Sequence, residues 1–321
     1  MISKPLIIKN IKNTLKTVDL PKNFGKKHQG KVRDYYIFKD NRIIITTDRQ
    51  SAFDKILGLI PFKGQVLTQM SQFWFEKTKN IIQNHLITIP DPIAMIVKNC
   101  KTIPIEMVVR GFISGSTSTS IWTAYAKGER IIYGMKFPEG MKKNQKLKTP
   151  IITPTTKAEK GHDEKLTEKE ILQGKIISER LWKEMKRAAL ALFERGTRIC
   201  ARAGIILVDT KYEFGLDEKG KLMLIDEIHT PDSSRFWIKK TYQERLKKGL
   251  EPENFDKEFL RLWFKDRGYG GEGKPPKMPN EFIAKVSQRY ISIYEKITGR
   301  KFNVNLEENI KQRIKNNLKT I

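Results

Sequence analysis

The sequence predicts an α+β protein that forms either one large domain or two lobes. Its 321 residues exceed the usual size of a single domain. Up to about Asp54 the chain has the β-branched runs and turn residues of strands, whereas later segments repeat apolar residues at helical spacing. An apolar content of 39% is enough to form a sizeable core.

The first half of the chain contains two strand candidates and a helix candidate. "RIIITTD" (residues 42–48) is a β-branched run typical of a buried strand, and "IPIEMVVRG" (103–111) is a second apolar strand. Between them, apolar residues recur at helical spacing from Val66 to Lys77.

In the second half of the chain, an irregular segment precedes a helical region, and the tail is helical in pattern. Residues 138–165 are rich in proline, glycine and lysine, and a loop of that length is usually functional or mobile. "TEKE" (167–170) fits a capping box that opens a helical region, and the stripe from Leu181 to Leu192 indicates a buried helix face with Gly204 as its C-cap. The tail, for example "EFIAKVSQRYISIYEKI" (281–297), has a helical pattern.

Composition favours a soluble cytoplasmic protein without a membrane partner. Charged residues make up 31% of the chain, and its apolar runs are far shorter than a membrane span. Lysines interrupt the apolar N-terminal stretch, so a signal peptide is not expected. Cys100 and Cys200 lie far apart without CxxC spacing, which argues against a disulfide framework or a zinc site.

The net charge of +26 raises the question of nucleic-acid binding. Nucleic-acid binders concentrate basic residues in a patch, an arm or a recognisable module. Here the lysines are spread along the whole chain, and none of the common modules occurs. We therefore expect no nucleic-acid partner, and a surface that attracts anionic substrates.

The stretch Val208–Trp237, "VDTKYEFGLDEKGKLMLIDEIHTPDSSRFW", predicts a hairpin with charges in an unusual place. Alternation puts Asp209, Lys211 and Glu213 on one face of the first strand, and either Asp226 or Glu227 joins them from the second strand, depending on its register. A solvated sheet face is one interpretation. The other is a Mg²⁺–phosphate site, because carboxylates at strand ends suit a hard cation.

Four further motifs contain residues that could bind a ligand or take part in a reaction, each with little specificity of its own. A glycine before Lys31 would let a phosphate approach, although a plain turn is the simpler interpretation. The other three are "RGFISGSTSTS" (110–120), with an arginine fork and small donors, "TPTTKAEKGHDE" (153–164), and "TPDSSRFW" (230–237).

Taken together, these blocks resemble the phosphoribosylaminoimidazole-succinocarboxamide synthase (SAICAR synthetase) family, in its longer branch. The matching stretches occur in order between residues 30 and 237. They are "GKVRD", "TTDRQSAFD", "GQVLTQMSQFWF", "VVRGFISGS", "TPTTKAEKGHDE", "LVDTKYEFG" and "IDEIHTPDSSRFW", and a later "KMP" also fits. After "SGS" the sequence departs from the family, because "TSTSIW" delays the tryptophan to Trp122.

The resemblance implies a two-lobed α+β fold with ATP in the cleft. Residues 1–110 would form a small β-rich nucleotide-binding lobe like that of protein kinases, and residues 111–321 a larger ATP-grasp-like α/β lobe with a helical C-terminal extension. The implied activity is an ATP-dependent ligase of de novo purine biosynthesis. It would join the carboxylate of 5-amino-1-(5-phospho-D-ribosyl)imidazole-4-carboxylate to the amine of L-aspartate through an acyl phosphate, giving SAICAR, ADP and phosphate.

The resemblance also implies the site residues. Lys31 and Arg33 would meet the ATP phosphates, Glu106 would lie near the ribose, and Glu213 and Asp226 would hold Mg²⁺ against the phosphates. The remaining candidates concern the imidazole ribonucleotide and L-aspartate. They are Asp54, Arg110, Ser116, Lys157, His162, Asp163, Asp209, Lys211 and Arg235, of which Asp209, Lys211 and Arg235 are the expected catalytic residues.

Two other functional classes compete with this interpretation. A phosphotransferase on a kinase-like fold would carry HRD and DFG motifs, which are missing from the sequence. A basic nucleic-acid-binding protein would show salt-dependent binding without turnover. We expect small-molecule substrates only, and a monomer or small homo-oligomer.

Overall fold

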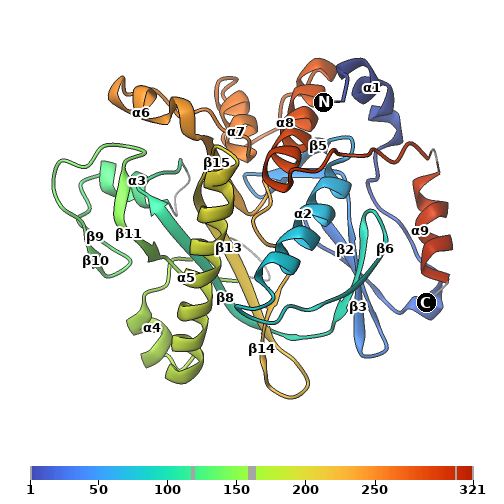
Figure 1. Cartoon of the computed structure of the whole chain (residues 1–321), viewed down its shortest axis with the longest axis horizontal. Coiled ribbons are helices and arrows are strands. Elements are labelled where there is room, and N and C mark those ends of the chain that lie inside the picture. Colours follow the sequence, from blue (N-terminus) through green and yellow to red (C-terminus); the bar gives the residue numbers. More distant parts are fainter. Residues whose placement is uncertain (1, 117–119, 158–163, 308, 320–321) are drawn as a thin grey trace.

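The computed structural model describes the chain except for residues 1, 117–119, 158–163, 308 and 320–321. Its described residues contain two large antiparallel sheets and two short two-stranded ones, with helices around them (Figure 1). The predicted α+β fold class is confirmed. Among the described residues, no helix has the length and apolar character needed to cross a bilayer.

The first sheet has five strands and comes from the N-terminal third of the chain. In spatial order they are β1 (Lys27–Gln29), β2 (Arg33–Phe38), β3 (Asn41–Thr46), β7 (Ala94–Lys98) and β6 (Leu86–Asp91). The predicted strand at 42–48 is β3, whose isoleucines are buried on both faces. Ile44 faces the main core, whereas Ile43 and Ile45 pack against the N-terminal segment and α9 (Ile310–Lys319).

The second sheet has six strands and contains the charged hairpin. β8 (Lys101–Phe112) and β13 (Ile205–Leu216) are central, and the others pair with their outer edges. β11 (Lys146–Ile152) and β12 (Thr155–Thr156) pair with β8, whereas β14 (Leu222–Ile225) and β15 (Ser234–Ile238) pair with β13. The predicted hairpin is therefore confirmed, and its loop returns as a further strand on the same edge of β13.

A short turn from β7 into β8 joins the two sheets. Lys98 ends the first sheet and Lys101 begins the second. The expected lobe boundary at residue 110 falls inside β8, a strand of the second sheet. The division of the chain into lobes remains a proposal, and the turn at residues 99–100 is the point at which the sheets separate.

Two long helices cover the sheets. The predicted helix at 66–77 is α2 (Lys63–Thr78), which packs against β3 and α8 (Asn280–Thr298). α5 (Glu179–Arg202) lies along β13 and β8 (Figure 1) and buries the predicted stripe that includes Met185 and Leu192. The predicted capping box at Thr167 and Glu170 is present, and Gly204 follows α5 in a left-handed conformation, as expected of a glycine there.

The remaining elements are short and lie around these layers. The hairpins are β4 (Arg49–Ala52) with β5 (Lys55–Leu59), and β9 (Ile131–Ile132) with β10 (Met135–Lys136). The helices are α1 (Lys4–Lys9), α3 (Ile121–Ala126), α4 (Glu168–Gln173), α6 (Lys239–Lys247) and α7 (Lys257–Lys265), with 3₁₀ turns at Asn10–Asn13 and Lys22–Phe24.

Two expectations for local structure were wrong. The irregular segment 138–165 contains β11 and β12, because pairing with β8 orders residues whose own composition favours a loop. The N-terminal part is not only strands and turns, because α1 begins with a proline early in its first turn and packs on α8.

Candidate active site

The charged row predicted on β13 faces one side of the second sheet. Tyr212 and Phe214 are fully buried on the opposite face, as alternation requires. The expected alternation fails at Val208, where the strand has an irregularity and the side chain packs in a separate cluster with Phe112 and Trp237. Asp209 lies directly across from Arg110 on β8 and from Arg235 on β15. The row is therefore neither a plain solvated face nor part of the apolar core. Each of its charges meets an opposite charge.

Lys211 joins two carboxylates that would otherwise repel each other. Glu106 and Glu213 are directly opposed in the register of β8 and β13. The Lys211 ammonium donates to both at 2.5 Å, and Lys157 also binds Glu213. Burial acts to lower the pKa of Lys211, but the negative charges of Glu106 and Asp226 raise it above its usual value. Lys211 therefore stays positively charged.

Both acidic residues at the end of β14 reach the same arginine. Asp226 has a left-handed backbone with φ 64°, so the strand alternation stops at Ile225. Arg33 binds Asp226 at 3.1 Å and Glu227 at 2.5 Å. Although burial acts to raise the pKa of Asp226, the charges of Arg33, Lys211 and Lys157 lower it to about 2. The sequence left open whether Asp226 or Glu227 joins the charged face. In the structure both carboxylates do, because both line the same cavity.

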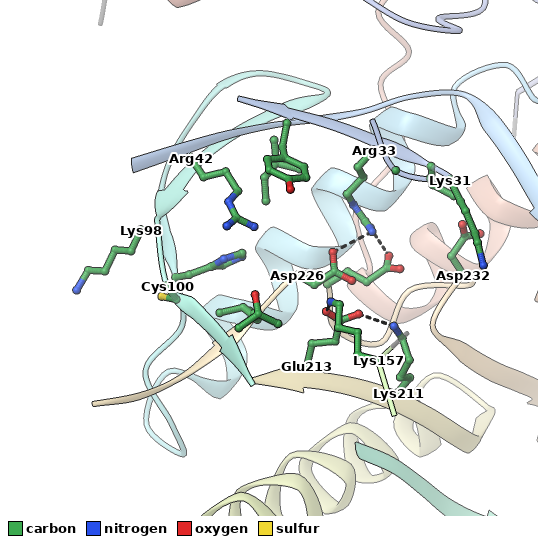
Figure 2. A pocket seen from close by; sticks show the side chains of 18 of the residues that line it. Lys31, Arg33, Arg42, Lys98, Cys100, Lys157, Lys211, Glu213, Asp226 and Asp232 are labelled. Atoms are coloured by element: carbon green, nitrogen blue, oxygen red, sulfur yellow. Dashed lines mark hydrogen bonds and ion pairs between the residues drawn. The ribbon is translucent and has the colours of Figure 1, made fainter. Parts of the chain in front are cut away.

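A cavity of about 460 Å³ lies between the two sheets, with these groups on its walls. Figure 2 shows Lys31 and Arg33 entering from the first sheet, opposite Lys211 and Glu213 from the second. Six of the predicted residues line it: Lys31, Arg33, Lys157, Lys211, Glu213 and Asp226. This cavity has basic residues on both sides and carboxylates at its centre, which suits a polyphosphate with a cation.

A smaller cavity of about 140 Å³ adjoins the first, over the other end of the β13 row. Its walls include the predicted residues Arg110, Asp209 and Arg235. Arg235 binds Asp209 at 2.6 Å, and Arg110 lies 3.6 Å from the same carboxylate oxygen. Two guanidinium groups around one carboxylate leave N–H donors for an anionic ligand.

Three residues line both cavities among the residues described. They are Lys211, Asp232 and Lys257. A group that passes from a ligand in one cavity to a ligand in the other would have to cross this point.

Three predicted residues lie at the edges of the cavities. Asp54 binds Lys31 on the exposed side, and Glu106 binds Lys211. The Ser116 hydroxyl donates to Glu258 at 2.6 Å, and Glu258 in turn lies 3.9 Å from Arg235. His162 and Asp163 lie outside the described residues, as does most of the loop after Ser116.

Sequence reasoning missed several residues of the two walls. Arg42, His85 and Lys98 line the first cavity, Arg261 lines the second, and Lys257 lines both. Asp232 was predicted only as one residue of the motif "TPDSSRFW", without a role of its own. Lys257 and Arg261 lie on α7, where a charged residue in an amphipathic helix ordinarily indicates a solvated face. Only the tertiary fold turns them toward the cleft.

Two antiparallel sheets with a charged cleft between them, and a second basic cavity next to it, define an α+β protein whose cleft suits two adjoining anionic ligands. The SAICAR synthetase family model matches residues 26–278. The chain belongs to the SAICAR synthetase family, whose activity is an ATP-dependent ligation in purine biosynthesis.

Individual relatives agree with the family match. A phosphoribosylaminoimidazole-succinocarboxamide synthase of Legionella pneumophila (strain Paris) is 54% identical over 281 residues, which cover 87% of this chain and 89% of the relative. The SAICAR synthase of Saccharomyces cerevisiae, solved in complex with SAICAR, superposes with a TM-score of 0.78 at 32% identity, over 91% of this chain and all of the other. A SAICAR synthetase solved with ADP gives 0.66 at 26% identity, over 87% of this chain and all of the other.

Proposed function

We propose that the chain joins the carboxylate of 5-amino-1-(5-phospho-D-ribosyl)imidazole-4-carboxylate to the amine of L-aspartate, with ATP as the co-substrate. The observation that carries the proposal is the pair of adjoining anion cavities that share Lys211, Asp232 and Lys257. An amine attacks a carboxylate poorly, so the carboxylate is first phosphorylated by ATP, and aspartate then displaces phosphate from the acyl phosphate. Such a route needs two bound anions with their reacting ends together.

The larger cavity is the proposed ATP site. Lys31 follows Gly30 in the turn before β2, so backbone and ammonium both approach a phosphate from the first sheet. Arg33 enters from the same side. Glu106 is the candidate for the ribose hydroxyls by resemblance to the family, and its carboxylate binds Lys211 in this structure. An ADP complex of a structural relative supports ATP as the co-substrate.

The smaller cavity is the proposed site of the ribonucleotide. Arg110 and Arg235 supply planar forks suited to carboxylate or phosphate. Ser116 stays a candidate from the family resemblance, although its hydroxyl donates to Glu258 in this structure. Lys211 lies where the substrate carboxylate would meet the γ-phosphate. Asp54, Lys157, His162 and Asp163 complete the proposed set for the ribonucleotide or aspartate. The complex of the yeast enzyme with SAICAR supports a product site within this fold.

Glu213 on β13 and Asp226 directly after β14 would hold a Mg²⁺ ion, which would supply positive charge to the ATP phosphates. No group of three His, Cys, Asp or Glu side chains in the described part of the chain is arranged as a metal cage. Mg²⁺ usually takes one or two carboxylates together with phosphate oxygens and water, and Glu213 and Asp226 provide such a pair. When bound, the ion would neutralise phosphate charge, and the protein groups that orient the reactants remain Lys31, Arg33 and Lys211.

The location and assembly of the enzyme belong to the same proposal. Cys100 and Cys200 are both free thiols, which suits the reducing cytoplasm. A monomer or small homo-oligomer stays a prediction.

An assay with each substrate omitted in turn tests the proposal. Release of ADP should require the ribonucleotide, and product should form only when aspartate is also present. Steady turnover of ATP to a stable phosphorylated ribonucleotide without aspartate would instead identify a phosphotransferase. Absence of turnover together with tight, salt-dependent RNA or DNA binding would identify the nucleic-acid-binding alternative.

A further inference from the structure

Asp232 holds two lysines and a tyrosine at the point where the cavities meet. Its carboxylate accepts from Lys63 at 2.8 Å, from Lys257 at 3.0 Å and from the Tyr290 hydroxyl at 2.6 Å. These three partners come from three different helices. Lys63 is the first residue of α2, Lys257 is the first residue of α7, and Tyr290 lies in α8.

The two lysines and the single carboxylate of this group leave one positive charge uncompensated. Two ammonium groups share one carboxylate, and the carboxylate is ionised because the charges of Lys257 and Lys63 outweigh the burial that acts to raise its pKa. Lys63 is fully buried, so its charge serves to neutralise Asp232 inside the protein. Lys257 keeps 13% of its side chain exposed and lines both cavities. The charge of Lys257 is therefore the one available to a ligand.

We propose that Lys257 is a further catalytic residue, which contacts the phosphoryl group as it passes between the two cavities, and that Lys63 and Tyr290 are positioning residues acting through Asp232. This inference rests on the proposed function. In the transfer, a carboxylate oxygen of the ribonucleotide forms a bond to the γ-phosphorus. The bond to the β–γ bridging oxygen breaks, and its electron pair leaves with ADP. Lys257 gives up no proton.

The geometry explains why a fixed ammonium is needed there. Negative charge accumulates on the transferred group and the bridging oxygen, and a preorganised cation stabilises it without reorganisation at the moment of reaction. A free lysine side chain would have to be ordered first, at an entropic cost. The Asp232 carboxylate restrains the Lys257 ammonium in advance, because Lys63 binds the same oxygen (Oδ2) and the Tyr290 hydroxyl donates to the other (Oδ1).

Single-turnover measurements on Lys257→Met test the catalytic part. With saturating ribonucleotide, aspartate and [γ-³²P]ATP, rapid quenching should show phosphoryl transfer slowed about 100-fold. The dissociation constant of ADP, measured by calorimetry, should stay within about threefold, since the adenosine end of the cavity is untouched. Lys240→Met, an exposed position on α6, is the matched control and should react at the wild-type rate.

Lys257→Arg is a second variant that tests the same role if the methionine variant folds poorly. The arginine retains the charge and should recover about a tenth or more of the wild-type rate. A Lys257→Met rate within threefold of wild type would overturn the inference, as would an arginine variant as slow as the methionine one.

Tyr290→Phe tests the positioning part, because it removes only the hydroxyl that binds Asp232. We expect transfer to slow about three- to tenfold with an unchanged KM for ATP. Tyr294→Phe on the same helix is the matched control. An unchanged transfer rate in Tyr290→Phe would contradict the positioning role. Failure of wild-type protein to consume ATP with both substrates would instead refute the proposed function, so the two failures are distinguishable.

Discussion

Glu106 and Glu213 lie directly opposite each other on β8 and β13, and both carboxylates bind the ammonium of Lys211 at 2.5 Å. Like charges directly across a strand pair destabilise a sheet unless a cation lies between them. Lys211 therefore has two tasks, since it holds the two strands together electrostatically and presents a fixed positive charge where the cavities adjoin.

Replacing Lys211 by alanine should nearly abolish turnover while the fold survives. The loss of a positioned cation at the reacting groups should lower kcat roughly 100-fold. Because Glu106 then loses the cation that separates it from Glu213, which keeps only Lys157, the free energy of unfolding should fall by about 1–3 kcal/mol, measured in urea. Lys240→Ala is the control at an exposed position. A kcat near that of wild type would remove Lys211 from the reaction.

Neutralising the two carboxylates of the proposed cation site should change the metal requirement. After treatment with EDTA, wild-type activity should return on titration with MgCl₂. Glu213→Gln and Asp226→Asn should each raise the Mg²⁺ concentration for half-maximal activity by at least about 10-fold, since each removes a charged oxygen ligand. An unchanged Mg²⁺ dependence in both variants would show that the cation binds elsewhere.

Substituting lysine for Arg235 should weaken the binding of the ribonucleotide and leave the binding of ATP unchanged. The guanidinium binds Asp209 at 2.6 Å and offers its other donors to the smaller cavity, and an ammonium cannot reproduce that planar fork. The lost charge-assisted hydrogen bond should raise the KM for the ribonucleotide about 10-fold. The KM for ATP should not change, and Arg202→Lys at an exposed position of α5 serves as control. Equal rises in both KM values would argue against two separate sites.

The buried ammonium of Lys63 should make stability rise with pH above 8. Burial lowers the pKa of Lys63 to about 8, although Asp232 acts to raise it. Between that value and the ordinary value of 10.5, the unfolded chain holds a proton that the folded chain has lost. The unfolding free energy contributed by this group therefore increases with pH, by about 2 kcal/mol from pH 7.5 to 9.5.

The comparison of wild type with Lys63→Met isolates this effect from the other titrating groups. Urea unfolding at pH 7.5, 8.5 and 9.5 should show the difference between the two proteins growing in favour of wild type. A difference that stays constant over this range would mean that Lys63 titrates with an ordinary pKa.

The sequence predicted the elements whose pattern is local. The alternation on β13 separated Asp209, Lys211 and Glu213 from the apolar face, and the capping box at Thr167 marked the start of a helix. The strand β11 could not be predicted in this way. Its residues are ordered by pairing with β8, and that contact is not encoded within its own stretch of sequence.

The site shows the same division between local and tertiary information. Strand alternation predicted that only one of Asp226 and Glu227 faces the cleft. The left-handed backbone at Asp226 instead lets both carboxylates bind Arg33. The glycine before Lys31 made this lysine a weak phosphate-binding candidate, and the resemblance strengthened it and added Arg33. Neither pattern nor resemblance pointed to Lys257, since a lysine at the start of an amphipathic helix has no distinguishing local feature.

Transfer of oxygen from the substrate carboxylate to phosphate tests the central claim most directly. The ribonucleotide would carry ¹⁸O in both carboxylate oxygens, and the phosphate released with ATP and L-aspartate would be analysed by mass spectrometry. Activation through an acyl phosphate predicts one ¹⁸O atom in every phosphate, because the bridging oxygen leaves with the phosphate when the amine attacks. Product formation with unlabelled phosphate would contradict the account.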